Sequence, residues 1–132
     1  MSEPSVSILI RSGSPTVAES ALSNTLGLPL ISSAELAPGN PEFYLCYTET
    51  GLSLNANDAR VSGAVVVDFD SKKLTRRAGD GLRQQNLIKA VGLKKRQTLR
   101  VLDATAGLGS DGFLLARAGC EVRLLERNAV VH

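Results

Sequence analysis

The residues best suited to chemistry lie in one glycine-rich stretch, T-L-R-V-L-D-A-T-A-G-L-G-S-D-G-F, at positions 98–113. Gly107 and Gly109 allow a sharp turn and let a ligand approach main-chain N–H groups that a β-carbon would obstruct. Asp103 precedes Gly107 by four residues, and Glu126 follows it by 19. A carboxylate at the first position suits an ammonium group, and one at the second suits two ribose hydroxyls. The spacing predicts a site for a nucleoside cofactor.

The same stretch also matches the dinucleotide fingerprint G-x-G-x-x-G, from Gly107 to Gly112. A dinucleotide would bring a pyrophosphate toward Asp103 and Asp111, which would repel it, whereas S-adenosylmethionine (SAM) brings a positively charged amino group. The small residues after Asp103 also give the D-x-x-x-G-x-G form of methyltransferases. The sequence favours SAM, with NAD and an unliganded turn as alternatives. A Walker phosphate loop is excluded because no Lys-Ser or Lys-Thr follows.

The elements that must position these residues form one βαβ unit. A strand is expected over 99–103, a glycine turn over 104–109, a helix over about 111–118 and a strand over 121–126. In such a unit the two strands are parallel and end at the same edge of the sheet, where α/β proteins bind their ligands. The predicted fold class is therefore α/β, with the first βαβ unit of a Rossmann-like methyltransferase fold, truncated before the sheet is complete.

The first half of the chain predicts a small α/β domain without a chemical motif. A helix is expected from about Pro15 to Leu26, capped by Ser14 and ended by Gly27. Strand-forming residues occur in four runs, the second and third joined by a hairpin turn and the last compact and buried; they cover 6–11, 43–48, 52–55 and 65–69.

The domain boundary is expected in the polar segment 72–81, which contains Gly79 and Gly81. After it, the pattern L-R-Q-Q-N-L-I-K-A-V at 82–91 predicts an amphipathic helix that stops at Gly92. We therefore expect an N-terminal domain over 1–75 and the start of the cofactor-binding domain over 76–132.

The net charge of +2 conceals a strong asymmetry. Up to Ser71 the chain has two basic residues against eight acidic ones, whereas residues 72–100, here called the basic belt, have ten basic residues and one acid, Asp80. Such clustering favours nucleic acid as a partner, because each neutralised phosphate releases condensed counterions. The alternative is a solvated basic face on a helix and its flanks.

The composition and a few single residues argue against a disordered, membrane-spanning, secreted or histidine-held metal protein. Hydrophobic residues make up 43% of the chain and charged ones 21%, as in ordinary globular proteins. The sequence shows neither a secretory leader nor a membrane-spanning stretch, so we expect a cytoplasmic protein without a membrane partner. Cys46 and Cys120 have apolar neighbours and are expected to be buried free thiols. The only histidine, His132, is the last residue, so no histidine-held metal is expected.

The run V-L-D-A-T-A-G-L-G-S-D-G-F-L-L-A-R-A-G-C-E-V-R-L-L-E-R-N, at 101–128, resembles the ribosomal RNA small subunit methyltransferase J family. Members of that family are SAM-dependent enzymes that methylate a guanine N2 in 16S rRNA. Two upstream stretches carry the same resemblance: V-D-F at 67–69 and R-R-x-G-x-G-L-R-Q-Q-N-L-I-K-A-V-G at 76–92. The likeness covers about 65–131.

The resemblance implies cofactor contacts in the glycine turn and after the second strand, and phosphate contacts in the belt. For the cofactor these residues are Ser110, Asp111, Glu126 and Arg127, with the pocket shaped by Asp103, Gly107 and Gly109; for RNA they are Arg76 and Arg77. The implied partner is 16S rRNA or the small ribosomal subunit. Ser110 stands where some members have arginine, and Ala129 where proline is common.

A larger departure is the missing Asp-Pro motif, with which the family holds the target nitrogen after a later strand. The string D-P does not occur in this sequence. We therefore expect an N-terminal fragment without a catalytic residue, inactive by itself.

Overall fold

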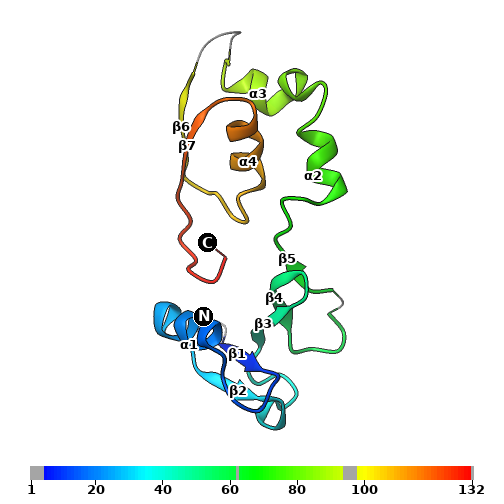
Figure 1. The fold of residues 1–132 in the computed structure, drawn as a ribbon, viewed down its shortest axis with the longest axis vertical. Coiled ribbons are helices and arrows are strands. Elements are labelled where there is room, and N and C mark those ends of the chain that lie inside the picture. The colour runs from blue at the N-terminus through cyan, green and yellow to red at the C-terminus, as the bar shows by residue number, and fades with distance from the viewer. Residues whose placement is uncertain (1–4, 62, 94–97, 132) are drawn as a thin grey trace. The chain divides into compact units, whose positions relative to one another are not determined.

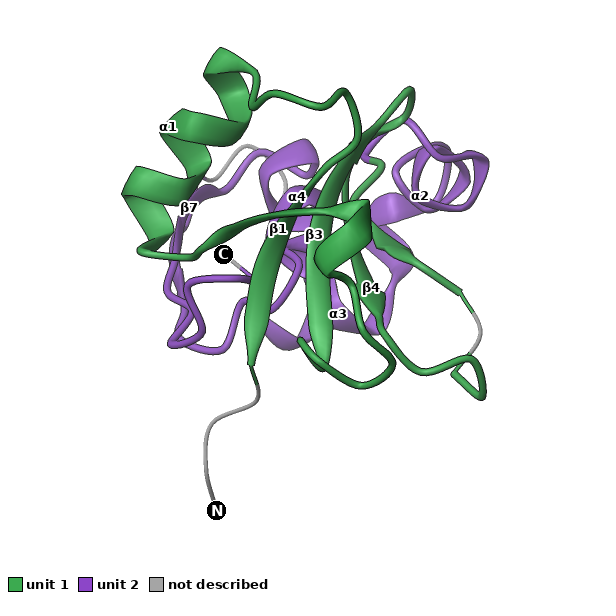
Figure 2. Ribbon diagram, turned by 90° about the horizontal axis from the view of Figure 1, so that it is seen from below, with its two compact units in different colours: residues 1–68 green, residues 69–132 purple. Residues whose placement is uncertain are grey.

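The structure is a computed structural model that describes residues 5–61, 63–93 and 98–131 (Figure 1). The fold is α/β, as the sequence predicts. Contacts divide the chain into two compact units, unit 1 from Met1 to Asp68 and unit 2 from Phe69 to His132 (Figure 2). The two units are defined by contacts. The functional domains expected over 1–75 and 76–132 stay a prediction.

Unit 1 is built on a five-stranded sheet in the order β2-β1-β3-β4-β5. Strand β1 pairs in parallel with β2 and β3, whereas β3 and β4 form the expected antiparallel hairpin and β5 adds to β4. Ile8 on β1 and Leu45 on β3 are buried neighbours at the centre of this sheet. The strands are β1 (Val6–Ile10), β2 (Leu30–Ser32), β3 (Phe43–Thr48), β4 (Gly51–Ala56) and β5 (Val65–Val66), and a short 3-10 helix, η1 (Ser33–Glu35), follows β2.

Helix α1 (Val17–Leu26) begins later than expected and lies beside β1 and β2 (Figure 2). The prediction of Ser14 as its cap is wrong, because Thr16 caps it. The Thr16 hydroxyl accepts a bond from the Glu19 N–H at 3.2 Å, and the Glu19 carboxylate accepts one from the Thr16 N–H at 2.7 Å. This capping box satisfies two main-chain donors at once, which Ser14 with Val17 at the matching position could not do. Gly27 ends the helix in the left-handed conformation, as expected.

The buried strand expected over 65–69 is also corrected. Strand β5 contains only two residues, and the side chains of Val65, Val67 and Phe69 are about half exposed. The reason is pairing: only Val65 and Val66 find partners on β4, at the edge of the sheet. The apolar run then leaves the sheet, and Phe69, the first residue of unit 2, stacks its ring on Phe113 of the same unit, with ring centroids 5.1 Å apart.

Unit 2 contains the predicted βαβ unit. Strands β6 (Arg100–Asp103) and β7 (Glu121–Leu124) pair in parallel, and helix α4 (Ser110–Arg117), which connects them, packs against β7 (Figure 1). Helices α2 (Lys72–Arg77), η2 (Leu82–Gln84) and α3 (Asn86–Ala90) precede it. The core of the unit is a cluster of buried side chains: Leu82, Ile88, Leu114, Leu115, Ala118 and Cys120.

The prediction of a single amphipathic helix over 82–91 is wrong in one respect, because the helix is not continuous. Leu82 and Ile88 are buried as the pattern requires, but the helix is interrupted at Gln85, whose backbone is extended (φ −66°, ψ 147°). The Gln85 side-chain amide donates a hydrogen bond to the Arg77 carbonyl at the end of α2. That hydrogen bond satisfies one of the main-chain acceptors at the C-terminal end of α2. The residue that interrupts the predicted helix therefore caps α2.

Cys46 and Cys120 are buried free thiols, as predicted. No helix in the described part of the chain is long and apolar enough to cross a bilayer. Among residues 5–61, 63–93 and 98–131, no group of three or more histidine, cysteine or acidic side chains is placed to hold a metal. His132 lies outside the described residues.

Candidate functional site

The glycine turn after β6 has the backbone conformation that its glycines allow. Gly107 (φ 51°) and Gly109 (φ 74°) both adopt the left-handed region, which side-chain-bearing residues rarely enter. No atom lies within 4 Å of the position that a β-carbon would take at Gly107, so the space above this residue is open. The turn itself is closed by a hydrogen bond from the Gly109 N–H to the Ala106 carbonyl, at 2.9 Å.

Gly112 has a packing role that sequence reasoning did not assign to it. A β-carbon there would lie 2.4 Å from Cδ2 of Leu124, so any larger residue would force this leucine of β7 to move. Glycine inside a helix is otherwise unfavourable by about 1 kcal/mol relative to alanine. The third glycine of the fingerprint therefore lets α4 approach β7 closely, and the G-x-G-x-x-G pattern was the signal for it.

The main chain ties the turn to the segment that follows β7. The Leu125 N–H donates to the Asp103 carbonyl at 2.8 Å, and the Ala106 N–H donates to the Leu125 carbonyl at 2.9 Å. These bonds extend the pairing of β6 with β7 beyond the last strand residues. They bring the turn and the acid after β7 to the same edge of the sheet.

Glu126 lies two residues beyond the end of β7, because the strand expected over 121–126 ends at Leu124. Its Oε1 accepts the Asn128 N–H at 2.9 Å, and its Oε2 accepts the Gly107 N–H at 2.9 Å. These two bonds, that from Asn128 first, lower the pKa of the Glu126 carboxyl below its ordinary value. The side chain is therefore a carboxylate at neutral pH, held against the glycine turn.

Asp103 ends β6 on the other side of the turn. Its Oδ1 accepts a hydrogen bond from the Thr105 N–H at 3.1 Å, which orients the carboxylate locally. The residue is half-buried, so the carboxylate has restricted freedom but remains accessible. This location, at the carboxyl end of a parallel strand, is the one that the spacing of Asp103 and Gly107 predicts.

Ser110 and Asp111 form the first turn of α4. The first N–H groups of a helix have no acceptor within it, and the helix dipole adds positive potential there. The Asp111 side chain is 60% exposed, and its Oδ1 lies 3.7 Å from Nη2 of Arg77 on α2. The first turn of α4 thus contacts the basic belt. Arg127 follows Glu126 and is exposed.

All the residues expected to bind the cofactor thus lie in three short segments of unit 2: the turn after β6, the first turn of α4 and the segment after β7. They are Asp103, Gly107, Gly109, Ser110, Asp111, Glu126 and Arg127. Of the two expected RNA contacts, Arg77 reaches this group through Asp111, and Arg76 is exposed on α2.

Comparison with known proteins then decides the family of this chain. The family described as "Putative SAM-dependent methyltransferase" matches residues 30–132. The chain belongs to this methyltransferase family. The match decides between the alternatives of the glycine fingerprint: the cofactor of the family is SAM, not NAD.

Curated relatives agree with the resemblance to the J family. This methyltransferase chain is similar to ribosomal RNA small subunit methyltransferase J of Pseudoalteromonas translucida (strain TAC 125), at 50% identity over 99 residues, 74% of this chain and 39% of the relative. It is also similar to the enzyme of that name from Yersinia pestis (strain Pestoides F), at 41% identity over 132 residues, 99% of this chain and 49% of the relative. The chain spans about half the length of the curated relatives it matches.

The residues present in the methyltransferase chain fit SAM. The open space above Gly107 leaves room for a ligand against the turn, where a β-carbon would stand in any other residue. The ionised Glu126 is an acceptor for hydroxyl groups, and the carboxylate of Asp103 is a partner for an ammonium group. These two acceptors are of the kind that the ribose hydroxyls and the amino group of SAM require.

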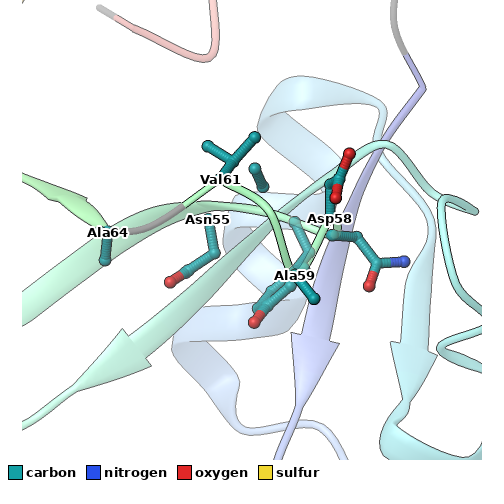
Figure 3. A pocket seen from close by; sticks show the side chains of 9 residues that line it. Asn55, Asp58, Ala59, Val61 and Ala64 are labelled. Atoms are coloured by element: carbon teal, nitrogen blue, oxygen red, sulfur yellow. The ribbon is translucent and has the colours of Figure 1, made fainter.

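A hollow of about 400 Å³ lies in unit 1, and none of the expected site residues lines it. Figure 3 shows Asn55, Asp58 and Val61 among the side chains that line it. Two of its polar side chains have partners: Asp58 pairs with Arg60 at 2.7 Å, and the Asn57 amide donates to the carbonyls of Ala37 and Pro41. The glycine turn therefore remains the candidate site.

Proposed function

We propose that this chain is the N-terminal half of an enzyme that transfers the methyl group of SAM to the exocyclic N2 of a guanine in 16S rRNA. The observation that carries the proposal is the hydrogen bond that the Gly107 N–H donates to Glu126, 2.9 Å long, which holds a carboxylate against a glycine turn. The names of the curated relatives, which specify small-subunit ribosomal RNA, supply the substrate class.

In this proposal each part of the site meets one part of the cofactor. Glu126 accepts hydrogen bonds from the two ribose hydroxyls, with Arg127 beside it, and the Asp103 carboxylate pairs with the amino group of SAM. Gly107 and Gly109 let the cofactor approach the main chain, and Ser110 and Asp111 border the site at the first turn of α4. SAM supplies a methyl group already activated by the sulfonium, so the contribution of the protein is to position the two reactants.

The basic belt is proposed to bind the ribosomal RNA, with Arg76 and Arg77 as phosphate contacts. The described part of the belt includes the exposed residues Lys72, Lys73 and Arg76 on α2. Its residues Lys94, Lys95 and Arg96 lie outside the described part of the chain. Exposed RNA bases near such a surface are accessible to methylation without unwinding a long duplex. We place the protein in the cytoplasm, where ribosomal subunits are.

No residue of this chain is assigned to hold the target nitrogen. The test uses a full-length form, in which the chain continues to the length of its curated relatives. With labelled SAM and small ribosomal subunits, this form should label 16S rRNA at a guanine N2, and the 132-residue chain should transfer no label. Labelling of another position by the full-length form, or transfer by the 132-residue chain, would contradict the proposal.

The alternative of another class is an RNA-binding module without catalysis, which the basic belt favours. It predicts salt-dependent RNA binding by the full-length form and no effect of SAM on that binding or on the melting temperature. A SAM-dependent rise of the melting temperature would exclude it, because only a ligand that binds the folded state stabilises it.

A further inference from the structure

Arg76 and Arg77 are neighbours in the sequence, but the structure gives them different surroundings. Arg76 is exposed, whereas the Arg77 side chain is 39% exposed and its Nη2 lies 3.7 Å from Oδ1 of Asp111. Successive residues of a helix point about 100° apart, so one arginine can face solvent while the next faces a packed neighbour. Asp111 belongs to the first turn of α4, at the border of the proposed cofactor site.

The position of Arg77 is held from several directions. Leu74 in α2 and Ala78 just after the helix pack against the core cluster of unit 2. The Gln85 amide donates to the Arg77 carbonyl, and the Ser71 hydroxyl caps the start of the helix by accepting the Leu74 N–H. These contacts fix the main chain of Arg77 at the end of α2, and from there its side chain reaches Asp111.

Folding stability does not explain this contact. Ion pairs between exposed side chains contribute little to the free energy of unfolding, since water screens them and ordering two long side chains costs entropy. A pair that adds little stability yet joins α2 to the first turn of α4 can still decide where a carboxylate points. A carboxylate that is already oriented loses less freedom when a ligand binds beside it.

We infer that Arg77 is a positioning residue of the cofactor site, holding the Asp111 carboxylate in place at the first turn of α4. The inference rests on the proposed function, which places SAM at this turn. It gives the two arginines different roles: Arg76 is proposed as a phosphate contact only, whereas Arg77 also acts on the cofactor through Asp111.

A purely electrostatic role for Arg77 would have the opposite sign. SAM carries two positive charges, on its amino group and its sulfonium, against one carboxylate. Removing a nearby arginine would therefore tighten the binding of SAM, and would do so less for S-adenosylhomocysteine, whose sulfur is neutral. Loss of positioning should instead weaken both ligands by the same factor.

The experiment is a double-mutant cycle in the full-length form, with calorimetric titration of SAM and S-adenosylhomocysteine. Arg77→Ala should weaken both ligands about three- to tenfold, and Arg77→Lys should restore part of this loss. In the Asp111→Ala background, Arg77→Ala should cause no further loss. The matched control, Arg76→Ala, should leave both affinities within about twofold, and melting curves should verify that every variant is folded.

Three results would overturn the inference. The first is that Arg77→Ala binds both ligands as tightly as wild type, whereas Asp111→Ala binds both more weakly. This result would contradict the inference but not the proposed cofactor site. Independent, additive losses from the two substitutions would show that Arg77 does not act through Asp111. If neither Asp111→Ala nor Glu126→Ala changes SAM affinity in a folded protein, the proposed site itself is wrong, and the inference falls with it.

Discussion

The carboxylate of Glu126 accepts a hydrogen bond from the Gly107 N–H at 2.9 Å, although the two residues are 19 positions apart in the sequence. The fold itself thus aligns the glycine turn after β6 with the acid after β7. Such alignment would lower the ordering cost of binding, because the carboxylate that we propose as the acceptor for the cofactor ribose is already in place.

Glu126→Ala in the full-length form should weaken SAM at least tenfold, since charge-assisted hydrogen bonds to the ribose hydroxyls are removed. Water can replace the carboxylate at the Gly107 and Asn128 N–H groups, so the melting temperature should change little. Calorimetric titration and melting curves measure the two effects separately.

The control for this substitution is Glu121→Ala. Glu121 is an exposed acid at the start of β7, with Oε2 only 3.8 Å from Nε of Arg100. Its replacement removes the same charge at the other end of the strand and should leave SAM affinity unchanged. Equal SAM affinity in folded Glu126→Ala would show that the ribose binds elsewhere.

The pH dependence of stability should carry the signature of Glu126. Its pKa is lowered by the bonds from Asn128 and Gly107, below the ordinary value of 4.5. The stabilisation from this lowered pKa is fully present above the ordinary pKa and disappears as the pH falls through the pKa of the folded protein. The small difference in melting temperature expected between wild type and Glu126→Ala should therefore be constant from about pH 7 to about pH 5 and shrink only in more acidic solution. A difference that shrinks already above about pH 5 would contradict the assigned bonds.

Gly107→Ala should reduce SAM affinity for a steric reason. An alanine with φ near 51° costs about 1 kcal/mol of backbone strain, and its methyl group would occupy the open space above the turn. Gly119, at φ 99° with nothing within 4 Å of its β-carbon position, offers a control away from the turn. Gly119→Ala should lower the melting temperature without weakening SAM. The same SAM affinity for wild type and Gly107→Ala would show that the cofactor does not approach this residue.

Replacement of Arg76 and Arg77 together by alanine should weaken RNA binding by the full-length form. The slope of log affinity against log salt concentration should fall by about 1 for each phosphate that the variant no longer neutralises. Filter binding at several salt concentrations measures both. Arg60→Ala in unit 1, which removes an arginine already paired with Asp58 at 2.7 Å, is the control and should leave the slope unchanged. An unchanged slope for the double variant would show that the two arginines on α2 do not bind RNA phosphates and belong to a solvated basic face.

Local features of this protein could be predicted from the sequence because neighbouring residues specify them. The turn at Gly107 and Gly109 follows from residues that alone tolerate left-handed backbone, and the hairpin of β3 and β4 follows from two strand-forming runs close together. The burial of Leu82 and Ile88 agrees with the apolar pattern of this segment, although the helix predicted there is interrupted at Gln85. Even here, the prediction of the helix cap is wrong, because the capping box of Thr16 and Glu19 is more favourable than a cap at the nearby serine.

The tertiary structure alone decided the contacts that join distant segments. The spacing of Gly107 and Glu126 indicated a shared site, but only the parallel pairing of β6 with β7 and the bonds beyond it place the two residues in hydrogen-bond contact. The approach of Arg77 to Asp111 depends on how α2 packs, which the break at Gln85 helps to decide. No local propensity encodes such contacts, because their free energy comes from burying side chains and pairing main-chain groups that are neighbours only after the chain has folded.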